Sequence, residues 1–280
     1  MKVGVHVSIA GSIDRAVDRA MEKKCETFQI FTRNPRGWAF KGLKEEERKA
    51  FLAKVKAFGI WPPIDHMPYL PNLASPRDDI YEKSVATLKV ELERCGELAI
   101  PYLVTHCGSH LGKGKDEGFQ RIVAALKEGL GAVENEVMVL LENTAGTAHS
   151  MGTTFEDIER ILEAVGNERL GTTFDTCHAF AAGYDLRKPE ALEETMKAFD
   201  EVIGLDRLKA VHLNDSKGDL GSHLDRHEHI GMGHIGEESF RTILSHEVFQ
   251  KAPLILETPI DERRDDLGNL AKVRELAGHG

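Results

Sequence analysis

The stretch HLDRHEHIG, residues 223 to 231, gathers side chains that bind metal ions. It holds three histidines, two acidic residues and one arginine, and the window from His212 to His234 holds five of the 13 histidines of the chain. Imidazole and carboxylate groups without thiolates are ligands that zinc, manganese or iron use at catalytic sites. Asp225 and His227 stand two residues apart, so in an extended segment their side chains point to the same side. The stretch therefore predicts part of a metal site.

The elements that must position these residues follow from the apolar pattern. Short apolar runs alternate with longer amphipathic segments, and parallel strands that are buried on both faces are apolar throughout. The predicted strands are 2–6, 27–31, 61–66, 101–106, 137–142, 170–175, 208–212 and 253–257. The predicted helices are 13–24, 45–58, 80–98, 116–134, 154–165, 189–203, 237–246 and 265–277. Gly59, Gly166 and Gly204 each follow a predicted helix, where a left-handed C-terminal residue favours glycine, and Pro189 suits a first helical turn.

This repetition of strand and helix has no obvious linker, so we expect one catalytic domain over residues 1–280. Eight such units favour the α/β class and a (β/α)8 TIM barrel, whose active site lies at the C-terminal ends of the strands. A doubly wound open sheet is the alternative that the pattern leaves open.

The last residues of the predicted strands support a barrel. Seven of the eight are metal-competent or acid–base residues, namely His6, His66, His106, Glu142, Asp175, His212 and Glu257, and the eighth is Phe31. A lone histidine at a strand end is more often a hydrogen-bonded structural residue. In a barrel, however, all of these ends meet on one face. Seven such residues at strand ends therefore favour a shared site.

Two pairs just beyond strand ends enlarge the set. DTCH, residues 175 to 178, puts Asp175 and His178 three apart on one turn, and DRH supplies Asp225 and His227. The candidate ligands are then His66, His106, Glu142, Asp175, His178, His212, Asp225, His227 and Glu257. This set is too large for one tetrahedral ion and suits three divalent ions with a bridging carboxylate. His223 and His229 remain outside it, and we expect them to be solvated or to support the ligands.

The amino-acid composition limits the class to which the protein can belong. A content of 41% hydrophobic and 29% charged residues is typical of a globular chain, and no apolar run approaches the length of a membrane span. An N-terminus without a signal-peptide pattern and four cysteines without CxxC spacing predict a cytoplasmic protein with reduced thiols, Cys177 being a packed one. The formal net charge of −10 argues against nonspecific coating of nucleic acid but leaves room for a local basic groove.

Several segments resemble the endonuclease IV family of metal-dependent apurinic/apyrimidinic endonucleases. They are GVHVSIAGS (4–12), HMPYLPNLASP (66–76), THCGSH (105–110), LENTAG (141–146), DTCHAFAAGYD (175–185), HLNDSKGDLGSHLDRHEHIGMGHIG (212–236) and LILET (254–258). DTCHAFAAGYD and the HLND…DRH segment are highly specific, whereas LENTAG alone would be weak. The resemblance covers nearly the whole chain and implies a (β/α)8 barrel with a trinuclear site. It implies Zn²⁺ in this site, with Mn²⁺ or Fe²⁺ possible.

The resemblance also implies how the ligands divide. One ion takes His66, His106 and Glu142; a second, bridged by Glu142, takes Asp175, His212 and Glu257; the third takes His178, Asp225 and His227. All of the family's ligand types are present. Cys107, after His106, departs from the proline that we expect in relatives.

The implied partner is double-stranded DNA with an abasic site or a blocked 3′ end, bound by a monomer. Hydrolysis of the phosphodiester 5′ to the abasic site leaves a 3′-hydroxyl and a 5′-deoxyribose phosphate. A hydroxide that bridges two ions would be the nucleophile, because a metal lowers the pKa of bound water to about 7. Glu142 or Glu257 would orient it, so these two are the candidate catalytic residues. The same pocket could also clean blocked 3′ ends.

DNA contacts are expected from two loops. Arg36, Tyr69 and Leu70 align with loops that enter DNA in the family, and Tyr69 and Leu70 would fill the gap that the missing base leaves. Arg33 and Arg36 offer positive charge for phosphates. Packing at the barrel rim is the alternative role of Tyr69 and Leu70.

Two other functions fit parts of the pattern. A metal-dependent sugar isomerase or epimerase would use the same barrel, but such enzymes hold one or two ions and lack the DRH pair. A noncatalytic DNA-damage binder with structural zinc would favour sites rich in cysteine, and the candidate ligands here include none.

Overall fold

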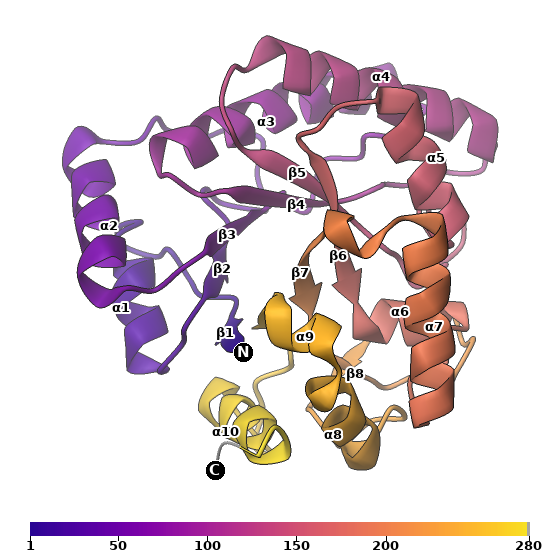
Figure 1. Cartoon of the computed structure of the whole chain (residues 1–280). Helices are drawn as coiled ribbons and strands as arrows, with labels where there is room; N and C mark the ends of the chain where they lie inside the picture. The colour runs from indigo at the N-terminus through magenta and orange to yellow at the C-terminus, as the bar shows by residue number, and fades with distance from the viewer. Residues whose placement is uncertain (279–280) are drawn as a thin grey trace.

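The computed structural model describes residues 1–278, which form eight parallel strands surrounded by helices (Figure 1). The strands are β1 (Lys2–Val5), β2 (Phe28–Ile30), β3 (Pro63–His66), β4 (Tyr102–His106), β5 (Met138–Glu142), β6 (Leu170–Asp175), β7 (Leu208–His212) and β10 (Pro253–Leu256). Their order is β1-β10-β7-β6-β5-β4-β3-β2. A parallel bridge between His6 and Gln29 joins the first strand to the second, and Val7 N donates to Gln29 O at 2.8 Å. The sheet therefore closes into the predicted (β/α)8 barrel, and the open sheet is excluded.

The outer helices follow the predicted segments closely. They are α1 (Arg15–Glu22), α2 (Glu45–Phe58), α3 (Asp78–Glu97), α4 (Lys115–Ala132), α5 (Phe155–Val165), α7 (Pro189–Val202), α8 (Glu237–Ser245) and α10 (Asp266–Leu276). Gly59 and Gly166 are left-handed residues that end α2 and α5, and Pro189 opens α7, as predicted. The prediction for Gly204 is wrong: its φ of 93° and ψ of 128° lie outside the left-handed helical region, because the residue leads into the short 3-10 helix η1 (Leu205–Arg207).

The apolar pattern did not reveal several short elements. These are α6 (Thr176–Ala182), the two-residue strands β8 (Asp215–Ser216) and β9 (His227–Glu228), and α9 (Glu247–Lys251). Each is too short to show a helical or strand period in sequence. Among residues 1–278 we find no helix with the length and apolar character to span a membrane.

Two apolar cores hold the barrel together. The larger lies between the strands and the helices; there, Phe174 of β6 contacts Phe155 of α5 and Phe199 of α7 at ring distances of 6.4 and 5.9 Å. The smaller fills the inside of the barrel with one side chain from each of five strands: Ile64, Val104, Leu140, Ala210 and Ile255, all with no exposed surface. Close packing of this kind makes the inside of a barrel solid rather than a pore.

Candidate metal centre

The inner core determines which side chains face the C-terminal end of the barrel. Because side chains alternate along a strand, the residue two positions after each inner core residue also faces inward. These residues are His66, His106, Glu142, His212 and Glu257, one each from β3, β4, β5, β7 and the end of β10. Alternation of apolar residues therefore brings five of the candidate ligands onto one layer above the core.

Glu142 lies at the centre of this layer and has no exposed surface. Its Oε2 is 3.3 Å from His66 Nε2 and 3.4 Å from His106 Nε2, whereas Oε1 is 2.9 Å from His212 Nδ1. His212 Nδ1 also lies 3.5 Å from Glu257 Oε2. The two oxygens of Glu142 thus face different groups of histidines, as a bridging carboxylate would.

Asp175 and His178 lie together because β6 passes directly into α6. Asp175 is the last residue of the strand and the N-cap of the helix, where its Oδ1 accepts from His178 N at 2.8 Å. The sequence spacing predicted that both residues would lie on one turn, and the structure agrees. Both are buried, and Asn143 holds them: its Oδ1 accepts from Asp175 N at 2.8 Å, and its backbone oxygen is 2.9 Å from His178 Nδ1.

Asp225 and His227 come from the loop 213–236, which is folded around one buried carboxylate. Asp215 accepts hydrogen bonds from five backbone N–H groups, those of Ser216, Gly231, Gly233, Ile235 and Gly236, at 2.8 to 3.3 Å. A Cβ atom on Gly233 would lie 2.4 Å from Ser216 O and 2.5 Å from Asp215 Oδ1, so the loop needs glycine there. This compact loop carries Asp225 Oδ1 to 3.2 Å from His178 Nε2.

The structure gathers all nine candidate ligands into three sets, and in each set the ligand atoms lie within 4.8 Å of one another. The sets are His66, His106 and Glu142; Glu142, Asp175, His212 and Glu257; and His178, Asp225 and His227. They coincide with the division that the family resemblance implies. A fourth grouping puts Cys177 with Asp175 and His227. The Cys177 thiol donates from Sγ to Arg226 O at 3.6 Å, and burial raises its pKa to about 12. Asp175 and His227 each belong to one of the three sets without it.

The hydrogen bonds of the histidines fit a metal centre. In His66, His178 and His227 the Nδ1 atom faces a backbone carbonyl oxygen, at 2.7, 2.9 and 3.0 Å. With Nδ1–H donating to that oxygen, Nε2 keeps a lone pair that points into the cluster, as metal-bound histidines do. The buried Nε2 of His227 has no hydrogen-bond partner among the described residues. This orphaned acceptor, together with the carboxylates around it, fits a divalent cation.

The charges of the cluster favour cations as well. Burial opposes charge on both Glu257 and His212, but His212 lowers the pKa of Glu257 to about 2, and Glu257 with Glu142 raises the pKa of His212 to about 9. In the metal-free chain a proton on His212 therefore compensates the carboxylates. A divalent ion would supply that positive charge instead, which turns clustered carboxylates from a cost into a favourable arrangement.

Comparison with known proteins agrees with this geometry. Residues 17–277 match the family model described as "Xylose isomerase-like TIM barrel". The chain is 60% identical over 278 residues to a protein of Methanoculleus marisnigri (strain ATCC 35101 / DSM 1498 / JR1) named "Probable endonuclease 4", and the match covers 99% of each sequence. The solved structure of endonuclease IV from Thermus thermophilus superimposes with a TM-score of 0.89 at 35% identity and covers 100% of both chains.

The chain belongs to the endonuclease IV family. The fold is shared more widely, since a D-tagatose 3-epimerase-like protein superimposes with a TM-score of 0.72 at 21% identity over 99% of this chain and 98% of that one. That likeness concerns the fold alone.

The loops expected to contact DNA in this endonuclease IV family member lie beside the metal-competent cluster. Arg36, Tyr69 and Leu70 are all exposed, and Tyr69 N donates to Pro35 O at 3.2 Å, which joins the two loops. The Tyr69 ring lies 4.9 Å from that of Phe31. Both line a cavity of about 400 Å³ together with several candidate ligands, among them His66, His106, His178, Asp225, His227 and Glu257. The position of Tyr69 at this cavity argues against rim packing as its only role.

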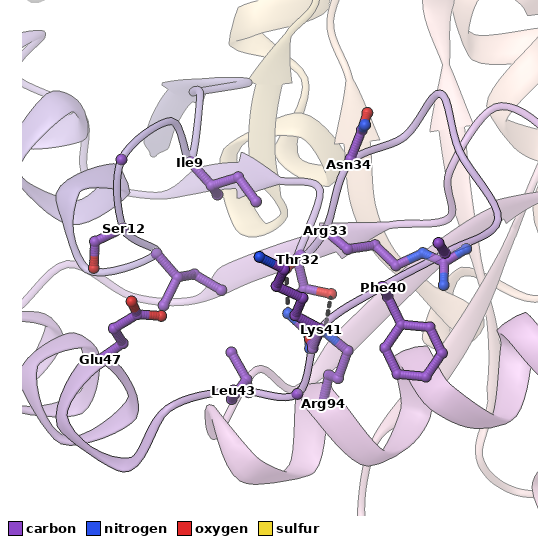
Figure 2. Close-up of a pocket in the computed structure, with 14 residues that line it drawn as sticks. Ile9, Ser12, Thr32, Arg33, Asn34, Phe40, Lys41, Leu43, Glu47 and Arg94 are labelled. Atoms are coloured by element: carbon purple, nitrogen blue, oxygen red, sulfur yellow. Dashed lines mark hydrogen bonds between the residues drawn. The ribbon is translucent and has the colours of Figure 1, made fainter.

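The expectation that Arg33 contacts phosphates is wrong. Its side chain is buried, and Nε lies 3.1 Å from Glu91 Oε1 of α3. Next to it, Arg94 donates from Nε to Thr32 Oγ1 at 2.9 Å and from Nη1 to Lys41 O at 3.1 Å. Figure 2 shows Thr32, Arg33, Lys41 and Arg94 around a second cavity of about 590 Å³. A sequence pattern does not distinguish the two arginines, and here Arg33 anchors the loop that exposes Arg36.

One residue at the centre of the site was not among those predicted from the sequence. Gln29 of β2 is fully buried, donates from Nε2 to Glu257 Oε1 at 2.6 Å, and lies with Oε1 2.8 Å from His212 Nε2. Its Nε2 is also 3.1 Å from His6 Nδ1. Burial lowers the pKa of His6 to about 4, so this histidine is neutral, and it belongs to none of the three sets. A glutamine inside the apolar run TFQIF was the available signal.

The two remaining histidines of the opening stretch differ from each other. His223 is exposed, with Nδ1 3.0 Å from Ala145 O, as expected of a solvated residue. His229 is fully buried and contacts Asp261 and Asn269 rather than any candidate ligand, so the expectation for it is wrong.

Proposed function

We propose that this protein is a DNA-repair endonuclease that hydrolyses the phosphodiester 5′ to an abasic site in duplex DNA. The products would be a 3′-hydroxyl and a 5′-deoxyribose phosphate. The observation that carries the proposal is the presence of three overlapping sets of imidazole and carboxylate groups on the active face of the barrel. Relatives named "Probable endonuclease 4" support it. We further propose that the chain acts as one catalytic domain and as a monomer.

We propose that the three sets hold three divalent ions, Zn²⁺ in the first place, with Mn²⁺ or Fe²⁺ as alternatives at some positions. Glu142 would belong to two of the sets. When bound, such ions lower the pKa of coordinated water towards 7 and neutralise charge on phosphoryl oxygens.

Residues of the chain would position the reacting groups. Glu142 and Glu257 accept hydrogen bonds across the site, which supports a role for them in orienting a water molecule against phosphorus. Gln29 holds Glu257 through a 2.6 Å hydrogen bond and keeps that carboxylate fixed. No serine, cysteine or lysine is needed as a nucleophile, and the buried Cys177 thiol is a packing group.

The exposed loops would recognise the damage. A missing base removes stacking, so the sugar leaves the duplex at a lower cost than an intact nucleotide. Tyr69 and Leu70 would occupy the vacated space, and Arg36 would contact the backbone. Because the cavity is open, a blocked 3′ end could also reach the cluster, and we therefore propose 3′-phosphodiesterase activity as well.

The first test is incision of a labelled duplex with one tetrahydrofuran analogue of an abasic site, with metal analysis on the same sample. The analogue cannot undergo β-elimination, so a lyase reaction cannot imitate hydrolysis. We expect a single cut on the 5′ side, about three ions per chain, and loss of both after prolonged chelation. A fully metal-loaded chain that leaves the duplex intact contradicts the proposal.

Two variants with the same chemical change test whether the reaction depends on the three sets. E142Q keeps the size of the side chain but removes the charge shared by two sets, so we expect loss of metal and of incision together. E46Q makes the same change at an exposed position of α2 and should leave both unchanged.

The main alternative is a sugar isomerase or epimerase on the same barrel. The epimerase-like structures support the fold only, and the set formed by His178, Asp225 and His227 has no role in a site of one or two ions. Turnover of ketoses by a chain that does not incise the duplex would favour this alternative.

A further inference from the structure

The two most exposed large apolar side chains among residues 1–278 lie at the same cavity. They are Ile260, with 69% of its surface exposed, and Tyr69, with 66%. Both line the cavity of about 400 Å³ over the metal-competent cluster, and both line an adjoining cavity of about 1040 Å³ that includes Arg36. Apolar side chains kept exposed at the mouth of a cavity are typical of a binding surface.

Ile260 lies on a loop, residues 258–264, that is held in place by ion pairs. Arg263 donates from Nη1 and Nη2 to the two oxygens of Glu228, both at 3.0 Å, and from Nη2 to Asp261 Oδ2 at 2.6 Å. Asp261 N donates in turn to Arg264 O at 3.2 Å. These contacts tie the loop to Glu228 while Ile260 lines the cavity.

His229 adds a second, buried attachment. Asn269 Nδ2 donates to His229 Nδ1 at 2.9 Å, which leaves the proton on Nε2, and Nε2 donates to Asp261 Oδ1 at 2.9 Å. Glu228 and His229 belong to the opening stretch HLDRHEHIG but not to the metal-competent sets. Glu228 pairs with Arg263, and His229 donates to Asp261. These two residues therefore hold the loop 258–264 and are not candidate ligands.

The cavity has apolar walls and a polar floor. Phe31 and Tyr69 form one apolar contact, Ile260 contributes from the loop after β10, and histidines and carboxylates of the cluster complete the lining. A baseless deoxyribose has matching chemistry, because its ring carbons are apolar and its phosphates are anionic. A nucleotide that keeps its base would not leave the stack as readily.

We propose that Ile260 is a specificity-determining residue that packs against the extruded abasic sugar in the cavity that Phe31 and Tyr69 also line. The inference rests on the proposed function. Glu228, His229, Asp261 and Arg263 are positioning residues that hold the loop.

The test compares the affinity of wild-type and I260A protein for a tetrahydrofuran-containing duplex and for the same duplex intact. In the proposed complex the sugar would bury the Ile260 side chain. Its loss should therefore weaken binding of the abasic duplex about fivefold to thirtyfold, equivalent to roughly 1–2 kcal/mol. Affinity for the intact duplex, metal content and melting temperature should stay unchanged. F58A removes an exposed apolar side chain at the end of α2, away from both cavities, and serves as the control.

A second variant tests the positioning role. R263A should weaken binding of the abasic duplex in the wild-type background and have little further effect in the I260A background, because both changes remove the same contact. Additive losses would instead show that Arg263 contacts phosphate directly. Loss of metal from R263A would show that the substitution disturbs the neighbouring candidate ligand His227, and it would overturn the positioning role.

The outcomes separate this inference from the function on which it rests. Wild-type protein that does not incise the abasic duplex overturns both. Wild-type incision combined with unchanged I260A affinity, or with equal losses on abasic and intact duplex, overturns the inference alone. A loss confined to the abasic duplex supports it.

Discussion

Replacing Asp215 with asparagine should detach one part of the metal centre from the rest. The Asp215 carboxylate accepts five backbone hydrogen bonds, two at Oδ1 and three at Oδ2. Asparagine keeps one acceptor oxygen and puts a donating NH₂ group where the other oxygen was. At least two buried N–H groups of the loop 213–236 would then lose their acceptor.

The magnitude follows from those donors. Each unsatisfied buried N–H costs about 1–3 kcal/mol, so two or three of them, with partial relaxation of the loop, reduce the free energy of unfolding by about 3–5 kcal/mol. At roughly 2 °C per kcal/mol for a chain of this size, the melting temperature should fall by about 6–10 °C. The loop carries Asp225 and His227, so the set that they form with His178 should lose the ion that we propose for it, while the other two sets keep their proposed ions.

Thermal unfolding and metal analysis of D215N test this reasoning. The matched control is D219N, because Asp219 lies on the same loop but has 66% of its side chain exposed, and the substitution removes the same charge. We expect about one ion fewer per chain in D215N and wild-type values in D219N. Full metal content with a melting temperature within about 2 °C of wild type, a margin of about 1 kcal/mol, would refute the role of Asp215.

Three further variants test other parts of the site. Replacing Tyr69 and Leu70 together by alanine should weaken capture of abasic duplex about tenfold or more without changing metal content, measured by fluorescence anisotropy and metal analysis; unaltered affinity would refute the wedge role. Q29L removes a buried hydrogen-bonding group behind the cluster and should lower kcat about tenfold or more while KM for abasic duplex stays near wild type, in steady-state incision assays. E91Q leaves the buried Arg33 charge unpaired and should cost about 3–5 kcal/mol in chemical denaturation; a loss below about 1 kcal/mol would show that the pair does not anchor its loop.

Much of the barrel could be predicted from sequence because its strands are short, continuous apolar runs. The runs ending at His66, His106, Glu142, Asp175 and His212 end at the same residues in the structure. The other three predicted strands, which end at His6, Phe31 and Glu257, each extend one residue beyond the observed strand, because pairing in the closed barrel decides the last hydrogen bond. Alternation along each strand then brings the strand-end residues onto one face without further information.

The parts that sequence did not predict depend on contacts between distant segments. Arg33 and Arg36 are alike in a linear pattern, and only the position of Glu91 on α3 decides that Arg33 is buried. Gln29 gives no metal-binding signal of its own, because an amide matters here only as the partner of Glu257 and His212. Asp215 likewise accepts hydrogen bonds from backbone N–H groups of its loop, and these groups come together only when the chain folds.

HLDRHEHIG is rich in charged residues because its side chains contact both the metal-competent cluster and the loop 258–264. His227 directs Nε2 towards the cluster and bonds through Nδ1 to Glu257 O at 3.0 Å, whereas the adjacent Glu228 pairs with Arg263 on the loop 258–264. Within β9, adjacent side chains point to opposite sides, so His227 faces the cluster and Glu228 faces away from it. The strand ends at Glu228, and His229 beyond it does not follow the alternation but contacts Asp261. A shift of one residue would exchange these faces and put the wrong groups on both. The short pairing of β9 with β8, Asp215 opposite Glu228 and Ser216 opposite His227, prevents that shift. The antiparallel pair is thus the element that sets which residues of the stretch face the metal centre and which hold the loop that carries Ile260.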